Sequence, residues 1–292
     1  MKFDNPAWRS TPLRTGLNVA MSLVRRRASQ LSRAVVSYDD GRSSIYADLR
    51  TPLGLGLYRY GHRDADIALI GRLLGPDDVF IDGGANIGLF TLVAADRVGP
   101  NGKVIAFEPA RAVRMCLLEN VVLNRFSQVE VLPFALSSVP GEASFRAFEP
   151  GSAGLNHLCP TPGELGQIET VALTTLDAAL LPHDQQHLKL IKLDLEGAEH
   201  AALLGASRTL TESRPDILIE VEPSHLLRMG TTADALMALL RDYGYAFYRT
   251  SNDASGAPLL ISASDAGPAP RTPNVFATVN LERVRERGVA VL

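Results

Sequence analysis

The sequence of 292 residues contains only two cysteines, a single tryptophan and no apolar run that approaches the length of a membrane span. A transmembrane helix needs about 20 consecutive apolar residues, so we expect none here. Cys116 and Cys159 lie far apart and match neither a metal-binding nor a redox spacing, which predicts two unpaired thiols in a reducing compartment. No small-residue cleavage site follows the basic N-terminus, so we do not interpret it as a signal peptide. These absences together favour a cytoplasmic protein.

A large excess of charge of one sign is also missing. The formal net charge of −3 argues against general affinity for nucleic acids, and the hydrophobic fraction of 46% is that of a globular protein. Residues 1–35 differ from the rest because they carry seven basic residues and one acidic residue. Apolar residues recur there at steps of three or four, which predicts an amphipathic helix over residues 13–35. We expect this helix to pack on the domain or on a second copy of the chain in a homo-oligomer; contact with a membrane surface is the alternative.

Predicted strands and helices alternate along most of the remaining sequence. Strands are predicted at residues 79–82, 103–107, 129–136, 188–194, 217–221, 246–249 and 275–279 (the last closing the sheet), and helices at 65–74, 89–95, 112–124, 198–210 and 232–243. Such alternation is typical of an α/β fold with a mostly parallel sheet and helices on both faces. We expect this domain to span residues 61–292, after an N-terminal extension over residues 1–60 that holds short strands at 44–49 and 57–60.

Two segments depart from this alternation. Residues 143–147 and 170–174 alternate in polarity and predict a hairpin that flanks a polar loop at 149–166. Residues 251–273 are rich in serine, alanine, glycine and proline, which predicts a mobile connection.

The most distinctive stretch covers residues 79–90. Three apolar residues lead to Asp82, a turn with Gly83, Gly84 and Gly88 follows, and a second apolar run then begins. The spacing Asp-x-Gly-x-Asn-x-Gly matches neither the Gly-x-Gly-x-x-Gly turn of dinucleotide-binding proteins nor a P-loop. Glycines at such a turn permit a sharp bend and the close approach of a ligand to the backbone. Tight packing of a strand, a turn and a helix, without any ligand, is the alternative.

Acidic residues stand at the predicted carboxyl ends of four strands, namely Asp82, Glu108, Asp194 and, near the fourth, Glu220 and Glu222. Ligands of such sheets bind outside these ends, and a buried carboxylate without a partner costs free energy. A carboxylate at position 108 can accept hydrogen bonds from both hydroxyls of a ribose. A surface acid before Pro109 is the alternative.

A second acidic stretch contains Asp194, Glu196 and Glu199 in one short loop and the following helix start. Acids at a helix N-terminus are favoured by the helix dipole. Clustered carboxylates also hold divalent cations or act as general bases. Capping and catalysis remain equal alternatives for Glu199, whereas we favour a functional role for Asp194.

Six motifs occur in the order Val-Phe-Ile-Asp-Gly-Gly-Ala-Asn-Ile-Gly, Ile-Ala-Phe-Glu-Pro, Ala-Leu-Ser-Ser, Thr-Leu-Asp, Ile-Lys-Leu-Asp-Leu-Glu-Gly-Ala-Glu and Leu-Ile-Glu-Val. With these motifs, residues 65–250 resemble the FkbM family of S-adenosylmethionine-dependent methyltransferases. The resemblance implies a Rossmann-like class I methyltransferase sheet and O-methylation of a hydroxyl on a sugar, glycan, lipid or polyketide-type small molecule.

The resemblance also implies roles for individual residues. It implies that Asp194 and Glu196 lie near the transferred methyl group. It implies cofactor contacts at Asp82, Gly83, Gly84, Ala85, Asn86, Gly88, Glu108, Pro109, Ala135 and Leu136, the last two beside the adenine. Gly83 departs from the family, which more often has an apolar residue there, and this loosens the turn.

Three histidines are further candidates. His157 lies in the polar insertion, where it can act as the base that deprotonates a substrate hydroxyl, and a solvent-exposed loop position is the alternative. His200 and His225 follow acidic strand ends and are interpreted as helix surface, although either can join a metal site. A divalent metal is compatible with the acidic residues, but the sequence does not establish one.

Two other functions compete with methyl transfer. A nicotinamide-dependent oxidoreductase predicts a Gly-x-Gly-x-x-Gly turn, which the sequence lacks. A non-catalytic protein of the same fold, which binds the cofactor or a partner subunit, predicts cofactor binding without turnover.

Overall fold

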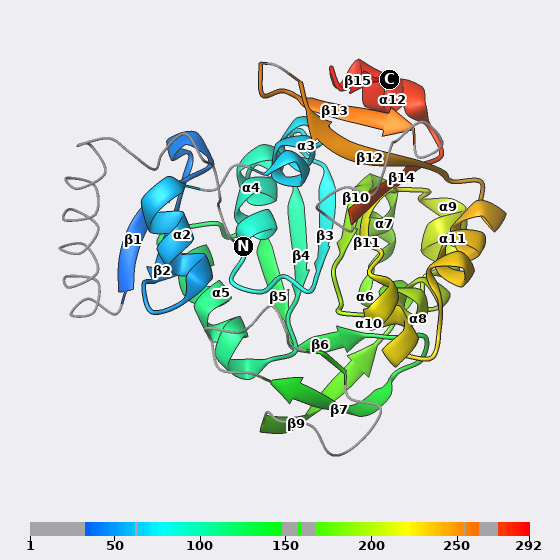
Figure 1. Ribbon diagram of the computed structural model, residues 1–292, viewed down its shortest axis with the longest axis horizontal. Coiled ribbons are helices and arrows are strands. Elements are labelled where there is room, and N and C mark those ends of the chain that lie inside the picture. Colours follow the sequence, from blue (N-terminus) through cyan, green and yellow to red (C-terminus); the bar gives the residue numbers. More distant parts are fainter. Residues whose placement is uncertain (1–32, 62–63, 148–156, 159–166, 254, 263–273) are drawn as a thin grey trace, which may run out of the picture.

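The computed structural model describes residues 33–61, 64–147, 157–158, 167–253, 255–262 and 274–292. A large sheet with helices on both faces forms the centre, a smaller sheet lies at one end, and a two-stranded hairpin lies at one side (Figure 1). The predicted α/β class is therefore confirmed. The predicted helix at 13–35 falls outside the described residues up to residue 32, and residues 33–35 belong to a strand instead.

The large sheet contains nine strands: β3 (Val79–Gly83), β4 (Lys103–Phe107), β5 (Val129–Leu132), β10 (Leu188–Leu193), β11 (Asp216–Glu220), β12 (Ala246–Asn252), β13 (Pro258–Ser262), β14 (Asn274–Thr278) and β15 (Ala290–Val291). Their spatial order is β15-β13-β12-β14-β11-β10-β3-β4-β5. Strands β5, β4, β3, β10 and β11 are parallel, and β14 runs antiparallel between β11 and β12.

The position of β14 corrects the expectation that it closes the sheet. Phe276 and Ala277 in this strand are fully buried, which fits an interior strand covered on both faces. The chain continues through α12 (Leu281–Glu286) to β15. Strand β13 is also a correction, because the composition of segment 251–273 predicts a mobile connection. Residues 263–273 of that segment lie outside the described residues.

Alternating side chains of the parallel strands divide the core into two layers. Ile81 packs on one face with residues of α8 (Glu199–Leu204), α9 (Ser207–Glu212), α10 (Pro223–Arg228) and α11 (Ala233–Asp242). Phe80 packs on the other face with residues of α3 (Ala65–Leu73) and α4 (Leu89–Val98). The period of two along a strand produces this division. Helix α5 (Arg111–Leu123) covers β4, and the short helices α6 (Leu176–Ala179) and α7 (Pro182–His187) precede β10.

The first described residues form β1 (Arg33–Tyr38), the turn η2 (Asp39–Gly41), β2 (Ser43–Asp48) and α2 (Pro52–Tyr60). The strand expected at residues 57–60 is thus a helix. The Thr51 hydroxyl caps it by accepting from the Gly54 amide, and Pro52 occupies its first turn, where a missing N–H costs nothing. Ile45 and Leu57 are buried against Leu92 of α4, so this segment packs directly on the large domain.

A four-stranded sheet in the order β6-β9-β7-β8 consists of β6 (Phe134–Leu136), β7 (Gly141–Ala147), β8 (His157–Leu158) and β9 (Gln167–Thr174). Strands β7 and β9 pair antiparallel, which confirms the predicted hairpin. The strand expected over 129–136 is divided at Pro133, which has no N–H for a sheet ladder. Its first half stays in the large sheet, and its second half enters the small one.

The helix expected over residues 198–210 is likewise divided, into α8 and α9. Gly205 lies at the break, where a Cβ atom would stand 2.2 Å from the carbonyl oxygen of Ser137. The chain therefore turns where two backbones make close contact. None of the helices in the described part of the chain has the length and apolar character that a membrane span requires.

Candidate active site

The turn between β3 and α4 packs against the end of β10. Gly84 has φ of 73°, and a Cβ atom there would lie 2.0 Å from the carbonyl oxygen of Asp194. Gly88 has φ of 99°, and a Cβ atom there would lie 2.6 Å from Leu117. These glycines are therefore required by backbone conformation and by close packing together. The result is that the two acidic stretches identified in the sequence meet at one edge of the sheet.

Glu108 follows β4 and is buried. Its two carboxylate oxygens accept hydrogen bonds from the amides of Asn86 and Ala110, both at 2.9 Å. Burial raises its pKa to about 7, although these amides oppose the shift. Each oxygen keeps a further lone pair, so the carboxylate can also accept two hydroxyl donors from a ligand.

Asp82 is completely buried, and its partners are other side chains of the protein interior. It accepts a hydrogen bond from the Thr91 hydroxyl at 2.6 Å, and the ammonium of Lys192 lies 3.4 Å away. Lys192 also donates to the Gly84 carbonyl at 2.9 Å and lies 3.6 Å from Asp194. Burial opposes the charge of Lys192, but Asp194 and Asp82 outweigh it and raise its pKa. Lys192, for which no role was expected, ties the glycine turn to the end of β10.

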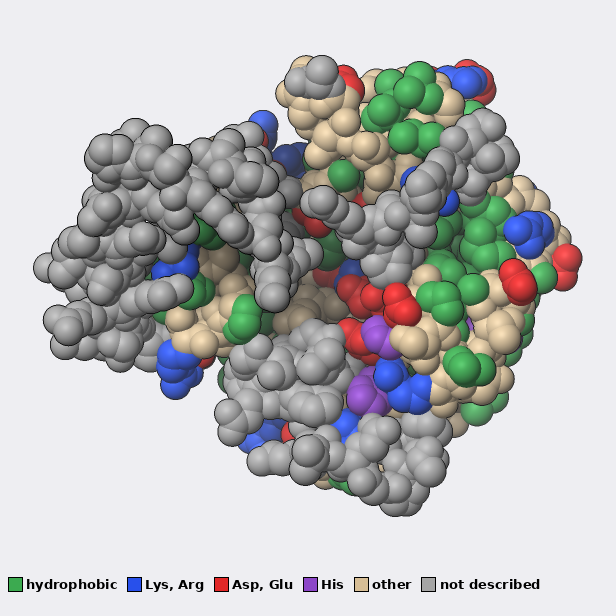
Figure 2. Space-filling model, viewed as in Figure 1, with side chains coloured by type: hydrophobic (Ala, Val, Ile, Leu, Met, Phe, Trp, Pro, Cys, Tyr) green, Lys and Arg blue, Asp and Glu red, His purple; other side chains and the backbone are tan. Residues whose placement is uncertain are grey.

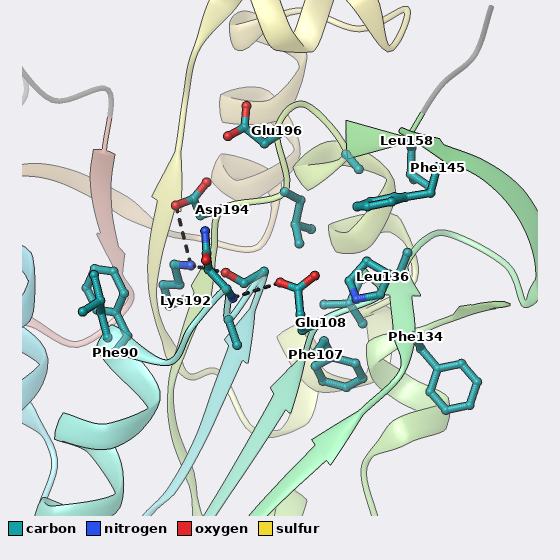
Figure 3. Close-up of a pocket in the computed structure, with 18 of the residues that line it drawn as sticks. Phe90, Phe107, Glu108, Phe134, Leu136, Phe145, Leu158, Lys192, Asp194 and Glu196 are labelled. Atoms are coloured by element: carbon teal, nitrogen blue, oxygen red, sulfur yellow. Dashed lines mark hydrogen bonds and ion pairs between the residues drawn. The ribbon is translucent and has the colours of Figure 1, made fainter. Parts of the chain in front are cut away.

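A cavity opens where the two sheets meet (Figure 3). One part of its wall is apolar and contains Phe107, Phe134, Phe145 and Leu158. The other part carries the charged side chains of Glu108, Lys192, Asp194 and Glu196. Leu53 of α2 and Phe90 of α4 complete the wall, so the segment before residue 61 contributes to the site.

Nine of the residues expected at the site line this cavity, namely Gly84, Ala85, Asn86, Glu108, Pro109, Ala135, Leu136, Asp194 and Glu196. Asp82, Gly83, Gly88 and His157 are not among the described residues that line it. Gly83 is packed closely by Leu193 and Leu136, so it acts through the shape of the turn.

The interpretation of His157 as an exposed loop residue or a base in the site is corrected by its position in β8. Its exposed fraction is 7%, and it pairs with Arg146 across the β7–β8 ladder. Its neighbour Leu158 lines the cavity together with Phe145. Because successive side chains of a strand point to opposite faces, His157 faces away from the cavity.

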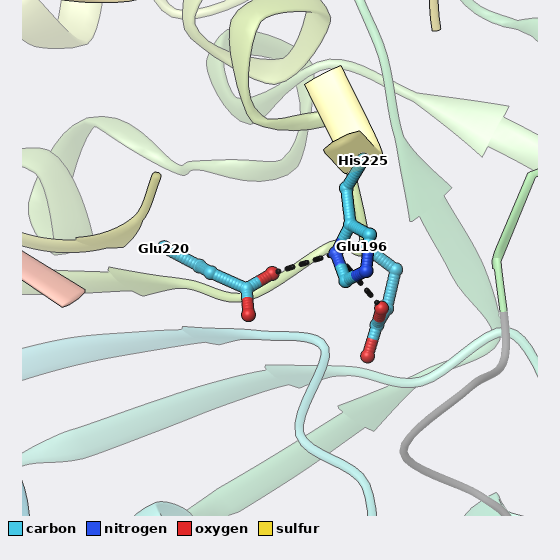
Figure 4. Close-up of side chains that lie close together, drawn as sticks. All are labelled: Glu196, Glu220 and His225. Atoms are coloured by element: carbon cyan, nitrogen blue, oxygen red, sulfur yellow. Dashed lines mark hydrogen bonds and ion pairs between the residues drawn. The ribbon is translucent and has the colours of Figure 1, made fainter. Parts of the chain in front are cut away.

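Three side chains that the sequence did not connect lie beside the cavity. His225 Nδ1 is 3.1 Å from Glu196 Oε2 and 3.4 Å from Glu220 Oε2 (Figure 4). Acidic side chains gather beside histidines near the middle of the face shown in Figure 2. Burial raises the pKa of Glu196 to about 8, with further contributions from Glu220 and Asp194. Burial and Asp194 raise the pKa of Glu220 to about 7. His225 follows Glu220 by five residues, and this spacing was the available signal.

Glu199 is buried and accepts hydrogen bonds from the amides of Leu195 at 2.6 Å and Gly197 at 3.3 Å. Of the two alternatives for this residue, the geometry favours capping of the loop before α8. Burial raises its pKa to about 7, opposed by these amide bonds.

The fold and the family match together define the class of the protein. Its large sheet is mostly parallel with helices on both faces, and β14 runs antiparallel between β11 and β12. The class binds its ligands at the carboxyl ends of the strands, where the cavity lies. Residues 82–247, more than half of the chain, match the family model described as the Methyltransferase FkbM domain, and the chain belongs to this family of S-adenosylmethionine-dependent methyltransferases.

Two curated relatives are similar to this chain over more than half of its length. The chain is 32% identical over 201 residues to Methyltransferase sdnD of Sordaria araneosa, a match that covers 58% of this chain and 74% of that protein. It is 32% identical over 214 residues to the AMB antimetabolite synthetase AmbE of Pseudomonas aeruginosa, covering 60% of this chain. The match spans only 10% of AmbE.

Solved structures resemble the chain more distantly. The structure of Methyltransferase FkbM from Methylobacillus flagellatus KT is 18% identical with a TM-score of 0.42, covering 69% of this chain and 43% of that one. M. jannaschii TYW2 in complex with AdoMet is 13% identical with a TM-score of 0.40, covering 84% of each chain. The assignment of this chain therefore depends on the family match.

Proposed function

We propose that the chain transfers a methyl group from S-adenosylmethionine to a hydroxyl of a small molecule or glycan, for example a sugar, a lipid or a polyketide-type compound. The observation that carries this proposal is the division of one cavity into an apolar part and a carboxylate-rich part, with Glu108 at the boundary of the two (Figure 3). S-adenosylmethionine has the same order of groups: a flat base, a ribose with two hydroxyls, and a cationic sulfonium with its amino acid.

The cofactor contacts follow from this order. Ala135 and Leu136 of β6 supply apolar surface for the adenine, and Glu108 accepts the ribose hydroxyls. The sulfonium end then lies near Asp194 and Glu196. Three carboxyl groups and one ammonium line the cavity, so ionisation of Glu108 and Glu196 beside Asp194 gives it a negative charge that favours a cationic donor.

In the proposed reaction, the oxygen of the acceptor hydroxyl attacks the methyl carbon in line with the sulfur. The new O–CH₃ bond forms as the CH₃–S bond breaks, which yields the methyl ether and S-adenosylhomocysteine. Asp194 accepts the hydroxyl proton. Its side chain is 39% exposed and lines the cavity, so a bound acceptor can reach it. Alignment of the two reacting groups supplies much of the acceleration in such displacements.

Isothermal titration of the full chain with S-adenosylhomocysteine, and separately with NAD, tests cofactor choice. We expect saturable binding at one site for S-adenosylhomocysteine and none for NAD. A screen of hydroxyl acceptors with methyl-labelled S-adenosylmethionine then tests the reaction. A folded protein that does not bind S-adenosylhomocysteine would overturn the proposal, whereas binding without transfer to any hydroxyl acceptor would support a non-catalytic role.

A further inference from the structure

Three side chains from three different elements converge beside the cavity. Glu196 lies in the loop after β10, Glu220 ends β11, and His225 lies in α10. One ligand atom from each lies within 4.8 Å of the other two. Figure 4 shows both carboxylates directed toward the same edge of the imidazole. The exposed fractions of these side chains are 15%, 14% and 24%, so the group is sheltered but still accessible to a small ion.

Hydrogen bonds alone do not account for this arrangement of the three side chains. Nδ1 of an imidazole has one bonding direction in the ring plane, which carries either a proton or a lone pair. Both carboxylates approach this same atom, at 3.1 and 3.4 Å. One N–H points well at only one acceptor, whereas an ion between the three atoms would accept a lone pair from each. We propose that Glu196, Glu220 and His225 bind a divalent cation.

The distances from His225 Nδ1 to the two carboxylates agree with coordination. Metal–nitrogen and metal–oxygen bonds of about 2.0–2.2 Å place neighbouring ligand atoms about 3.0–3.5 Å apart in tetrahedral or octahedral geometry. The two distances from His225 Nδ1 fall in this range. A set of one imidazole and two carboxylates suits Mn²⁺, Fe²⁺, Co²⁺ or Zn²⁺ better than Ca²⁺, which prefers oxygen alone.

The backbone around the site holds two of the ligands together. Gly197 has φ of 111°, and a Cβ atom there would lie 2.4 Å from the carbonyl oxygen of His225. The loop of Glu196 is therefore packed directly on α10. Arg228, from the same helix, donates to the carbonyl oxygen of Glu196 at 2.7 Å. Such fixed outer contacts orient ligands and strengthen metal affinity.

Binding of the ion does not depend on methyl transfer, but its role in the reaction rests on the proposed function. Glu196 also lines the cavity, so the ion would lie at the wall beside Asp194. Three protein ligands leave coordination positions open. An acceptor hydroxyl bound at one of them would become more acidic and would lose its proton to Asp194 more readily.

The test uses full-length protein that has been freed of metal with a chelator and then titrated. Mn²⁺ binding is followed by electron paramagnetic resonance, and Co²⁺ binding by its visible absorption spectrum, which reports nitrogen and oxygen ligation. We expect one ion per chain. His225→Gln and Glu220→Gln should each weaken binding about tenfold or more. Glu222→Gln is the matched control, because Glu222 lies two residues from Glu220 and bonds Ser224 instead; it should bind like the wild type.

Several results would overturn the inference. One is the absence of Mn²⁺ and Co²⁺ binding to the wild-type chain up to about 1 mM, a range that covers weak protein sites. Another is equal binding by the wild type and both ligand variants, or an equal loss in Glu222→Gln. The wild-type titration decides the matter even if a variant does not fold, which thermal unfolding would show.

Titration of the same preparations with S-adenosylhomocysteine separates the two proposals. Cofactor binding without metal binding would leave the proposed function and remove the metal site. Metal binding that His225→Gln abolishes, without cofactor binding, would do the reverse.

Discussion

At the scale of single residues, Glu108 links the fold to the ligand, because its carboxylate bonds two backbone amides and also faces the cavity. Its raised pKa favours the protonated form in the free protein. A carboxyl group whose pKa is higher in the folded chain than in the unfolded chain stabilises the fold at low pH. For Glu108 this stabilisation is lost as the pH rises through about 7. Ribose hydroxyls instead donate to the ionised carboxylate, so the affinity for the cofactor should increase as the pH rises.

We therefore expect the affinity for S-adenosylhomocysteine to rise between pH 6 and 8, by up to about tenfold per pH unit below the pKa. Calorimetric titration at several pH values measures this. Glu196, Glu199 and Glu220 also have raised pKa values near this range, so Glu108→Gln is needed as the comparison. This variant should bind about tenfold to a hundredfold more weakly at pH 8 and show a flatter profile. An unchanged slope in Glu108→Gln would assign the pH dependence elsewhere.

Asp194 belongs to the chemistry in our proposal, and Asp194→Asn tests this. The amide keeps the shape of the side chain but cannot accept the hydroxyl proton. We expect turnover to fall by about 10²–10⁴, the usual contribution of a general base, while the dissociation constant of S-adenosylhomocysteine changes little. Turnover is measured with an acceptor found in the screen. Equal losses in turnover and cofactor affinity would place Asp194 in the cofactor site instead.

At the scale of elements, the contact between the β3–α4 turn and the end of β10 brings the two acidic stretches together. Gly84→Ala tests this contact, because the new methyl group would meet the Asp194 carbonyl. Gly99→Ala is the matched control: Gly99 also has positive φ, at 68°, but nothing lies within 4 Å of its added Cβ.

The control should lose only the cost of placing an alanine at φ of 68° and ψ of −175°, a conformation nearly exclusive to glycine, about 1–3 kcal/mol. Gly84→Ala should lose more unfolding free energy than the control, because it adds a clash with the Asp194 backbone to the cost of a positive φ. Denaturant unfolding of both variants measures the difference. Equal losses of unfolding free energy in both variants would contradict the close contact between the turn and the end of β10.

At the scale of the whole molecule, the described segment before residue 61 packs against the large domain. Tyr38, Ile45 and Leu57 are buried against α4, and Leu53 lines the cavity. We propose that residues 1–60 form an extension of the domain at 61–292, with the basic amphipathic segment at its start outside the catalytic core.

Two truncations test this division. Removal of residues 1–32 should leave S-adenosylhomocysteine binding unchanged and reduce the assembly state, measured by light scattering. Removal of residues 1–60 should also destabilise the chain, because each buried side chain such as Ile45 or Leu57 contributes about 1.5–3 kcal/mol. If the shorter truncation abolishes cofactor binding and both long and short chains are monomers, the basic segment belongs to the catalytic core.

The sequence by itself determined the class of fold and the edge of the sheet that carries the site. The alternation of strands and helices is a local property, because apolar periodicity follows directly from backbone geometry. Parallel strands place their carboxyl ends at one edge, so the sequence predicts that Glu108 and Asp194 lie at the same edge of the sheet. The cavity contains both.

Only the tertiary structure decided which side chains face the cavity and which face the interior. Pro133 moved half of a predicted strand into a second sheet, and the register of β8 turned His157 away from the cavity. Asp82 is an internal partner of Lys192, whereas His225 of α10 contacts Glu196 of the loop after β10. The physical reason is that such contacts depend on strand order, register and backbone approach between segments far apart in the chain, and local periodicity carries none of these.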